Sequence, residues 1–235
     1  MQPTNKALGF QASSGDLPKR IPEIALRHGQ ALWLLTELGF RGDVAPPTFY
    51  EYIKSLRKLG IPFEAGEIGM ARRNLANYSY CHLMELALAL TLRVYNVVPD
   101  SVLVGIIRYR KSLRIHYRRA YAERCSGRGA PVVFETEGWP PIHLRGVFLD
   151  LQLESSGGRL TKLGPPRTLS PYEAVSSFTE RDLTTPTLLP IGLSLLAERL
   201  VALSFRVPSI RRGPRQSTTG PSHWGAEVAS TPKHG

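Results

Sequence analysis

The sequence predicts a mainly α-helical protein with small β elements, and three observations lead to that fold class. In the first half, apolar residues recur every three or four positions, the spacing of one helix face. Glycine or proline stands where each of these segments would end. After Gly127 prolines become frequent and short apolar runs alternate with polar residues, which indicates short strands and helices. We therefore expect two short helices, a small hairpin and a long helix, followed by a small mixed, proline-rich C-terminal region.

The first helix is expected to follow a polar, flexible arm that covers residues 1–20. It would begin near Pro22, since proline suits a first turn, and end at Gly39, which suits a C-cap. Arg41-Gly42-Asp43 is typical of a turn, and Pro46-Pro47 would stop any helix before the next one.

The second helix is expected at residues 48–59, within the stretch PPTFYEYIKSLRKLGIPF. Thr48 and Glu51 have the spacing of a capping box, and Gly60 would end the helix. One face is apolar, and the opposite face carries Tyr50, Lys54, Arg57 and Lys58. Two short helices joined by a tight turn, the second basic on its outer face, form the helix-turn-helix pattern.

A small hairpin is expected next, over residues 63–80, with Arg72 and Arg73 near its tip. A helix from His82 to about Val98 would follow, interrupted by Pro99-Asp100. Residues 101–124 then predict a long helix whose spacing suits pairing with another helix, from the same chain or from a second copy. The side chains of this expected dimer seam are Leu103, Ile106, Leu113, Tyr117 and Ala120, with Arg110 as the one polar break.

In the C-terminal half we expect a strand at 147–154, a turn at Ser155-Ser156-Gly157-Gly158 and a returning strand at 159–163. Short helices are expected at 171–178 and 191–205. The resulting regions are an arm (1–20), a DNA-binding domain (21–99), a dimerisation helix (100–126), a small mixed α/β region (127–205) and a disordered basic tail (206–235).

The charge of the chain limits the classes of function to consider, because a formal net charge of +11 predicts an anionic partner. Residues 1–128 hold 19 Lys+Arg against 10 Asp+Glu, a net of +9, so the front half carries most of this affinity. No apolar stretch predicts a membrane span, and two cysteines make no disulfide framework, so we expect a cytoplasmic protein. Metal-site, P-loop and dinucleotide-binding motifs do not occur, so we expect no enzyme, no catalytic residue, no metal and no cofactor.

The order of these parts resembles the MerR-type winged helix-turn-helix family. TFYEY lies where that family has the start of its recognition helix, and NYSYCHLMELALAL is similar to the end of its wing and the helix after it. The resemblance covers roughly residues 25–125 and implies a homodimeric transcriptional regulator that reads double-stranded DNA with residues 48–59. The DNA contacts it implies are Thr48, Tyr50, Lys54, Arg57, Lys58, Arg72, Arg73, Tyr78 and Tyr80.

Two other functions stay open at this stage. The arginine-rich run at 108–124 and the basic tail would also suit an RNA- or ribosome-associated module. The proline-rich back half would suit a small-molecule or protein interaction domain, and in a regulator an effector or partner protein would act there. The outer face of the second helix, for its part, would be an ordinary solvated surface if no nucleic acid bound it.

Overall fold

The computed structural model describes residues 23–64, 66–67, 77–95, 98–125, 132–136, 139–156, 159–179 and 190–209. Its helices are α1 (His28–Glu37), α2 (Pro46–Leu59), α4 (Tyr80–Leu90), the π-helical turn η1 (Thr91–Tyr95), α5 (Asp100–Arg108), α6 (Arg110–Cys125), α7 (Pro171–Thr179) and α8 (Leu193–Ser204). Its strands are β1 (Val132–Thr136), β2 (Trp139–Leu144), β3 (Phe148–Asp150), β4 (Leu153–Ser156), β5 (Arg159–Leu163), β6 (Arg167–Leu169) and β7 (Ile191–Gly192). The prediction of a mainly helical chain with small antiparallel sheets is confirmed.

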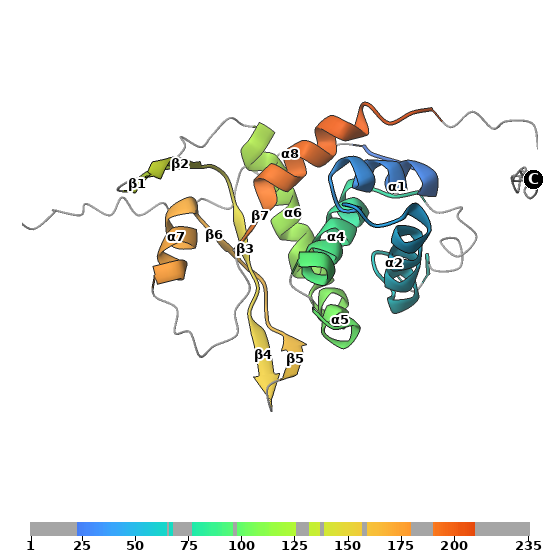
Figure 1. Cartoon of the computed structure of the whole chain (residues 1–235), viewed down its shortest axis with the longest axis horizontal. Coiled ribbons are helices and arrows are strands. Elements are labelled where there is room, and N and C mark those ends of the chain that lie inside the picture. The colour runs from blue at the N-terminus through green and yellow to red at the C-terminus, as the bar shows by residue number, and fades with distance from the viewer. Residues whose placement is uncertain are drawn as a thin grey trace, which may run out of the picture.

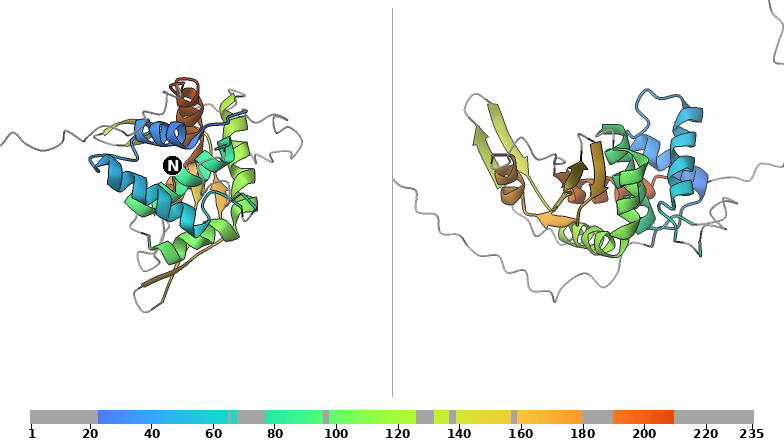
Figure 2. Two further views of the ribbon diagram at one scale, coloured as in Figure 1. Left: turned by 90° about the vertical axis from the view of Figure 1, so that its right-hand side faces the viewer. Right: turned by 90° about the horizontal axis from the view of Figure 1, so that it is seen from below.

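Helix α4 is the centre of the fold. Every one of its 11 residues is buried, as expected for a helix that is apolar around almost its whole circumference. In Figure 1 helices α1, α2, α5, α6 and α8 gather around α4, while α7 and most of the strands lie to the left and the β4–β5 hairpin projects at the bottom. The right-hand view of Figure 2, seen from below, shows the same division. One hydrophobic core joins residues from Leu26 to Leu200.

The first two helices differ from the predicted ones at their starts. Helix α1 begins at His28 rather than near Pro22, because the backbone of Leu26 is extended and pairs with Tyr78 through two hydrogen bonds. Helix α2 begins at Pro46, so the predicted capping box of Thr48 and Glu51 is wrong. Proline has the φ angle of a helix and no N–H to lose, so Pro46-Pro47 form the first turn of the helix instead of stopping it. The predicted end is confirmed, since Gly60 has a left-handed φ of 92°.

The long helix predicted at 101–124 is two helices, α5 and α6, with a break at Tyr109. The five side chains of the expected dimer seam, Leu103, Ile106, Leu113, Tyr117 and Ala120, are each 0% exposed within the single chain. Helices α4 and α8 pack against α6, and β5 packs against α5, so this chain itself covers the seam. The seam is therefore part of the core, and its assignment to a dimer interface is wrong.

The C-terminal half completes the same core. The predicted hairpin is confirmed as β4 and β5, which pair from Leu153↔Leu163 to Ser156↔Arg159. The strand predicted at 147–154 is split, because β3 pairs with β6 and β7 in a separate three-stranded sheet. The helices predicted at 171–178 and 191–205 are present as α7 and α8, and α8 packs on α6. The boundary expected at residue 126 does not interrupt the core, which includes Leu149 and Leu200.

Gly105 lets the β4–β5 hairpin approach α5. A Cβ atom at this position would lie 2.5 Å from the Cβ of Leu163, and neither atom is at the free end of a side chain. We expect Gly105→Ala to lower the free energy of unfolding by about 1–2 kcal/mol, because the forced shift of the hairpin outweighs the gain in helix propensity of about 1 kcal/mol. Urea denaturation measures this change. Gly66→Ala, where the added atom meets open space, is the matched control, and stabilisation by Gly105→Ala would contradict this packing.

Candidate nucleic-acid interface

Helix α2 has a buried face and a cationic face. Phe49, Ile53 and Leu56 are buried in the core. The remaining surface exposes Thr48, Tyr50, Lys54 and Lys58, with Arg57 half-buried beside them. Basic residues in the last turn and a left-handed glycine after it both stabilise the C-terminus of a helix. The local sequence of α2 and its packing on the core therefore both favour the helical conformation.

One acidic residue, Glu51, reduces the charge of this face. Its carboxylate accepts a hydrogen bond from Lys54 Nζ at 2.9 Å, and this contact raises the pKa of the lysine. Both side chains are well exposed, so the pair adds little to the stability of the fold. We name the exposed and half-exposed residues Tyr50, Glu51, Lys54, Arg57 and Lys58 the α2 outer face.

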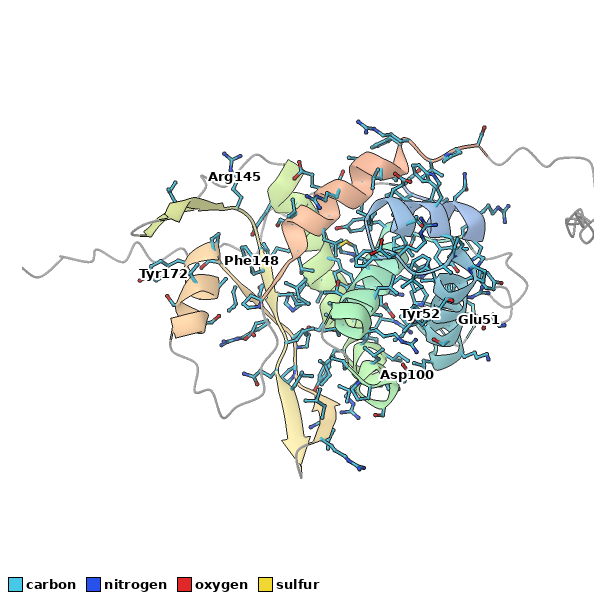
Figure 3. The ribbon with its side chains drawn as sticks, in the orientation of Figure 1. Glu51, Tyr52, Asp100, Arg145, Phe148 and Tyr172 are labelled. Carbon is cyan, nitrogen blue, oxygen red and sulfur yellow. The ribbon has the colours of Figure 1, made fainter. Side chains whose placement is uncertain are left out.

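The opposite side of α2 is fixed to η1 and α5 through Arg93. The Arg93 guanidinium lies 5.3 Å from the centre of the Tyr52 ring, donates to Ser55 and pairs with Asp100 at 3.4 Å. Figure 3 shows Tyr52 on the side of α2 that faces the body of the protein, and Glu51 on the outer side. The helix that carries the α2 outer face is thus attached to the body of the protein through its opposite side.

His28 connects α1 to the α2 outer face. It is the first residue of α1, and its ring is only 8% exposed. Its Nδ1 shares a hydrogen bond of 2.9 Å with the hydroxyl of Tyr78, and its ring meets the Tyr50 ring edge-on at 5.6 Å between centres. Nε2 of His28 is buried and has no hydrogen-bond partner among the described residues.

Burial, helped by the nearby Arg57 charge, lowers the pKa of His28 to about 4. In the unfolded chain the ordinary value near 6.5 applies, so the unfolded state binds more protons between these values. The stability that the neutral ring contributes is therefore complete above about pH 6.5, and it is lost as the pH falls toward 4. Burial also lowers the pKa of His82 and of His116, which adds to the same trend.

We expect His28→Gln to reduce the acid sensitivity of the protein. Between pH 7 and 4.5 the wild-type chain should lose about 2 kcal/mol of unfolding free energy more than the variant, because glutamine does not titrate. Urea denaturation at the two pH values measures the difference. Equal losses in the two proteins would show that folding does not lower the pKa of His28.

A buried ion pair holds the C-terminal end of α2. Glu85 of α4 is 0% exposed and accepts from Arg110 Nε at 3.0 Å and from Nη2 at 2.7 Å. The same guanidinium donates to the backbone oxygens of Gly60 at 2.6 Å and Phe63 at 3.4 Å. Burial raises the pKa of Glu85, and the adjacent Arg110 charge opposes that rise. Four segments, α4, α6, the C-cap of α2 and the chain after it, therefore meet at one guanidinium.

Glu64 and Glu67, which precede residues 68–76, contact helices α6 and α4, and Tyr78, which follows them, contacts the Phe63 ring. Glu64 accepts from Arg114 of α6 at 2.7 Å, and Glu67 lies 3.6 Å from His82. The Phe63 ring contacts the rings of Tyr78 and His82. Arg72 and Arg73, for which we predicted groove contacts, lie outside the described residues, as does most of the expected hairpin around them.

Two predicted contacts are wrong. Tyr78 and Tyr80 are each 1% exposed, so neither is available to a nucleic acid. The Tyr78 hydroxyl is engaged with His28, and the Tyr80 hydroxyl donates to the backbone oxygen of Tyr117 at 2.9 Å. Both tyrosines pack in the core that supports α2. Burial, the largest influence, raises the pKa of Tyr78 to about 12, so its hydroxyl stays protonated.

Helix α6 carries the second group of cations. Arg114 and Arg119 are engaged with Glu64 and Glu123, and Arg119 also donates to Thr168. Lys111 and Arg118 are exposed. This helix therefore presents fewer outward cations than the arginine-rich run in the sequence suggests, because Arg110 is buried as well.

Within the described part of the chain, no three His, Cys, Asp or Glu side chains lie together as metal ligands would. No described helix is both long enough and apolar enough to cross a membrane. The chain matches no protein-family model, no curated protein and no solved structure.

Proposed function

We propose that this protein binds double-stranded DNA through the α2 outer face, as a transcriptional regulator of the MerR-like winged helix-turn-helix type. The observation that carries the proposal is the pairing of a tightly anchored inner side with a cationic outer side on one short helix. A helix of 14 residues is about 21 Å long, and a single helix fits the major groove, which is about 12 Å wide.

The charges and side chains of this face suit duplex DNA. Lys54 and Lys58 can neutralise phosphates, and Arg57 can donate two hydrogen bonds to the edge of a guanine. Tyr50 can donate from its hydroxyl to a phosphate or pack on a base. The net charge of +11 supplies the long-range attraction that brings a polyanion to the site.

The proposal is made for a single copy of the chain. The predicted homodimer depended on the seam of α5 and α6, whose side chains are in the core. The proposed function also includes no effector or partner protein acting through residues 127–205, because the described residues of that region complete the core around α4 and α6.

The test is a comparison of nucleic acids in a fluorescence anisotropy titration. A random-sequence DNA duplex, a duplex selected from a random library and a structured RNA of equal phosphate number are titrated between 50 and 300 mM salt. We expect the selected duplex to retain the tightest binding at the highest salt, since base contacts survive screening better than phosphate contacts. Stronger binding of the RNA would support the alternative, in which Lys111 and Arg118 of α6 contact phosphates. Equal, weak binding of all three would reject both functions.

A further inference from the structure

The α2 outer face contains one aromatic side chain, Tyr50, and its ring contacts a neighbouring ring on α1. The residue is 36% exposed, so a partner molecule can reach part of it. It contacts the His28 imidazole, at 5.6 Å between centres and an interplanar angle of 73°. This edge-to-face geometry is the favourable one for two rings.

His28 is itself held rigidly. The Tyr78 hydroxyl fixes its Nδ1 at 2.9 Å, and the Tyr78 backbone makes two hydrogen bonds, of 3.1 and 2.8 Å, with Leu26. Phe63 packs on the far side of Tyr78, with 4.9 Å between ring centres. The ring that contacts Tyr50 is therefore the His28 imidazole at the start of α1. It is held in place by the Tyr78 side chain, which is fixed in turn by the backbone pairing with Leu26 and by Phe63 of the chain after α2.

We infer that His28 is a positioning residue for nucleic-acid binding, which fixes the Tyr50 ring in the orientation that the duplex meets. The inference rests on the proposed function of the α2 outer face. A tyrosine on a solvated helix face samples several rotamers and loses that freedom when a ligand immobilises it. A ring already held by His28 has lost most of that freedom in the unbound protein, so binding orders it at little further cost.

The groups that face His28 indicate that it positions Tyr50 and does not contact the nucleic acid itself. From α2 it meets the Tyr50 ring and the Arg57 charge, and from the chain before α4 it meets the Tyr78 hydroxyl. With Nδ1 engaged and Nε2 buried, the imidazole does not reach a ligand itself, so any effect on binding passes through Tyr50.

A double-mutant cycle between positions 28 and 50 tests the inference on the full chain. His28→Asn keeps a polar partner for Tyr78 but removes the ring, whereas His28→Phe keeps the ring and loses the hydrogen bond. We expect His28→Asn to weaken duplex binding about three- to tenfold and His28→Phe to leave it within about twofold, because the ring contact is what orients Tyr50. In the Tyr50→Ala background, His28→Asn should have no further effect.

Tyr78→Phe gives a second route to the same answer, because it releases His28 while both rings remain. Since it removes the same hydrogen bond as His28→Phe, it should weaken binding by no more than about twofold in the wild-type chain and not at all in the Tyr50→Ala background. An equal loss of affinity with and without Tyr50, for either variant, would overturn the positioning role and leave a merely structural one. If the wild-type chain binds no duplex, the proposed function fails and this inference fails with it; if the wild type binds but the losses add, this inference fails alone.

Discussion

Replacing Glu85 by alanine is expected to lower the free energy of unfolding by about 3–5 kcal/mol, the usual cost of leaving one partner of a buried ion pair alone. The Arg110 guanidinium would then lie in the core without a carboxylate beside it, an uncompensated buried charge. It would keep the backbone oxygens of Gly60 and Phe63 as acceptors, but not a countercharge. Chemical denaturation at pH 7 measures the loss.

The reverse variant, Arg110→Ala, should behave differently with pH. Burial already raises the pKa of Glu85, and removing the guanidinium raises it further, so the folded variant would hold a neutral carboxyl group at moderately acidic pH. Since the folded state then binds more protons than the unfolded state, stability is present at low pH and lost as the pH rises through the folded pKa. Glu85→Ala should not show this dependence.

An exposed ion pair of the same composition provides the control. Glu64 and Arg114 also join the chain after α2 to α6, at 2.7 Å, but the Glu64 side chain is largely exposed. Glu64→Ala should therefore cost less than about 1 kcal/mol. The double variant Glu85→Leu with Arg110→Met should recover most of the stability lost in the single variants. Equal costs for Glu85→Ala and Glu64→Ala would mean that the Glu85–Arg110 pair is not buried as described.

Removing the three cations of the α2 outer face should have the largest effect on nucleic-acid binding. We expect the combined change Lys54→Ala, Arg57→Ala and Lys58→Ala to weaken duplex affinity about a hundredfold or more, equivalent to about 3 kcal/mol. The slope of log affinity against log salt should become shallower by about one for each lost phosphate contact. Arg57→Ala alone should cost about 1–3 kcal/mol and relax sequence preference at one base pair, if Arg57 reads a base.

Two further variants make this prediction specific to the face. Glu51→Gln removes the acidic group that pairs with Lys54 and releases that lysine, so it should strengthen duplex binding. The pair Lys111→Ala and Arg118→Ala removes two exposed cations from α6 and should change duplex affinity by only a few fold. Comparable losses from the α2 and α6 variants would indicate general attraction to charge rather than a binding face.

Local signals in the sequence predict most of the helical boundaries and one hairpin. Gly60 and Gly39 mark helix ends because left-handed backbone favours glycine, and both have positive φ. The β4–β5 hairpin follows from alternation around a polar turn. The start of α2 was missed because Pro46-Pro47 suit both a stop before a helix and a first turn, and only the packed helix distinguishes the two.

The contacts that support the candidate site depend on tertiary structure. Glu85 and Arg110 are 25 positions apart, and nothing in their local sequence pairs them. A signal did exist, since Glu85 is a lone charge within an apolar run and Arg110 is the one polar break in the apolar spacing of residues 103–120. Two charges of opposite sign are expected to meet if both are buried. His28 gave no comparable signal. The apolar spacing of residues 103–120 correctly indicated a buried helix face, but spacing does not say whether the same chain or a second copy covers it.

Photo-crosslinking from defined positions tests the central claim, that duplex DNA lies against the α2 outer face. p-Benzoylphenylalanine is introduced in place of Tyr50, in place of Ile115 on α6, or in place of Tyr172 on α7, and each protein is irradiated with the selected duplex. All three side chains are exposed, so accessibility alone does not separate them. The account predicts a crosslink to DNA from position 50 that competing unlabelled duplex abolishes, with little from positions 115 and 172. Efficient crosslinking from position 115 and none from position 50 would contradict it.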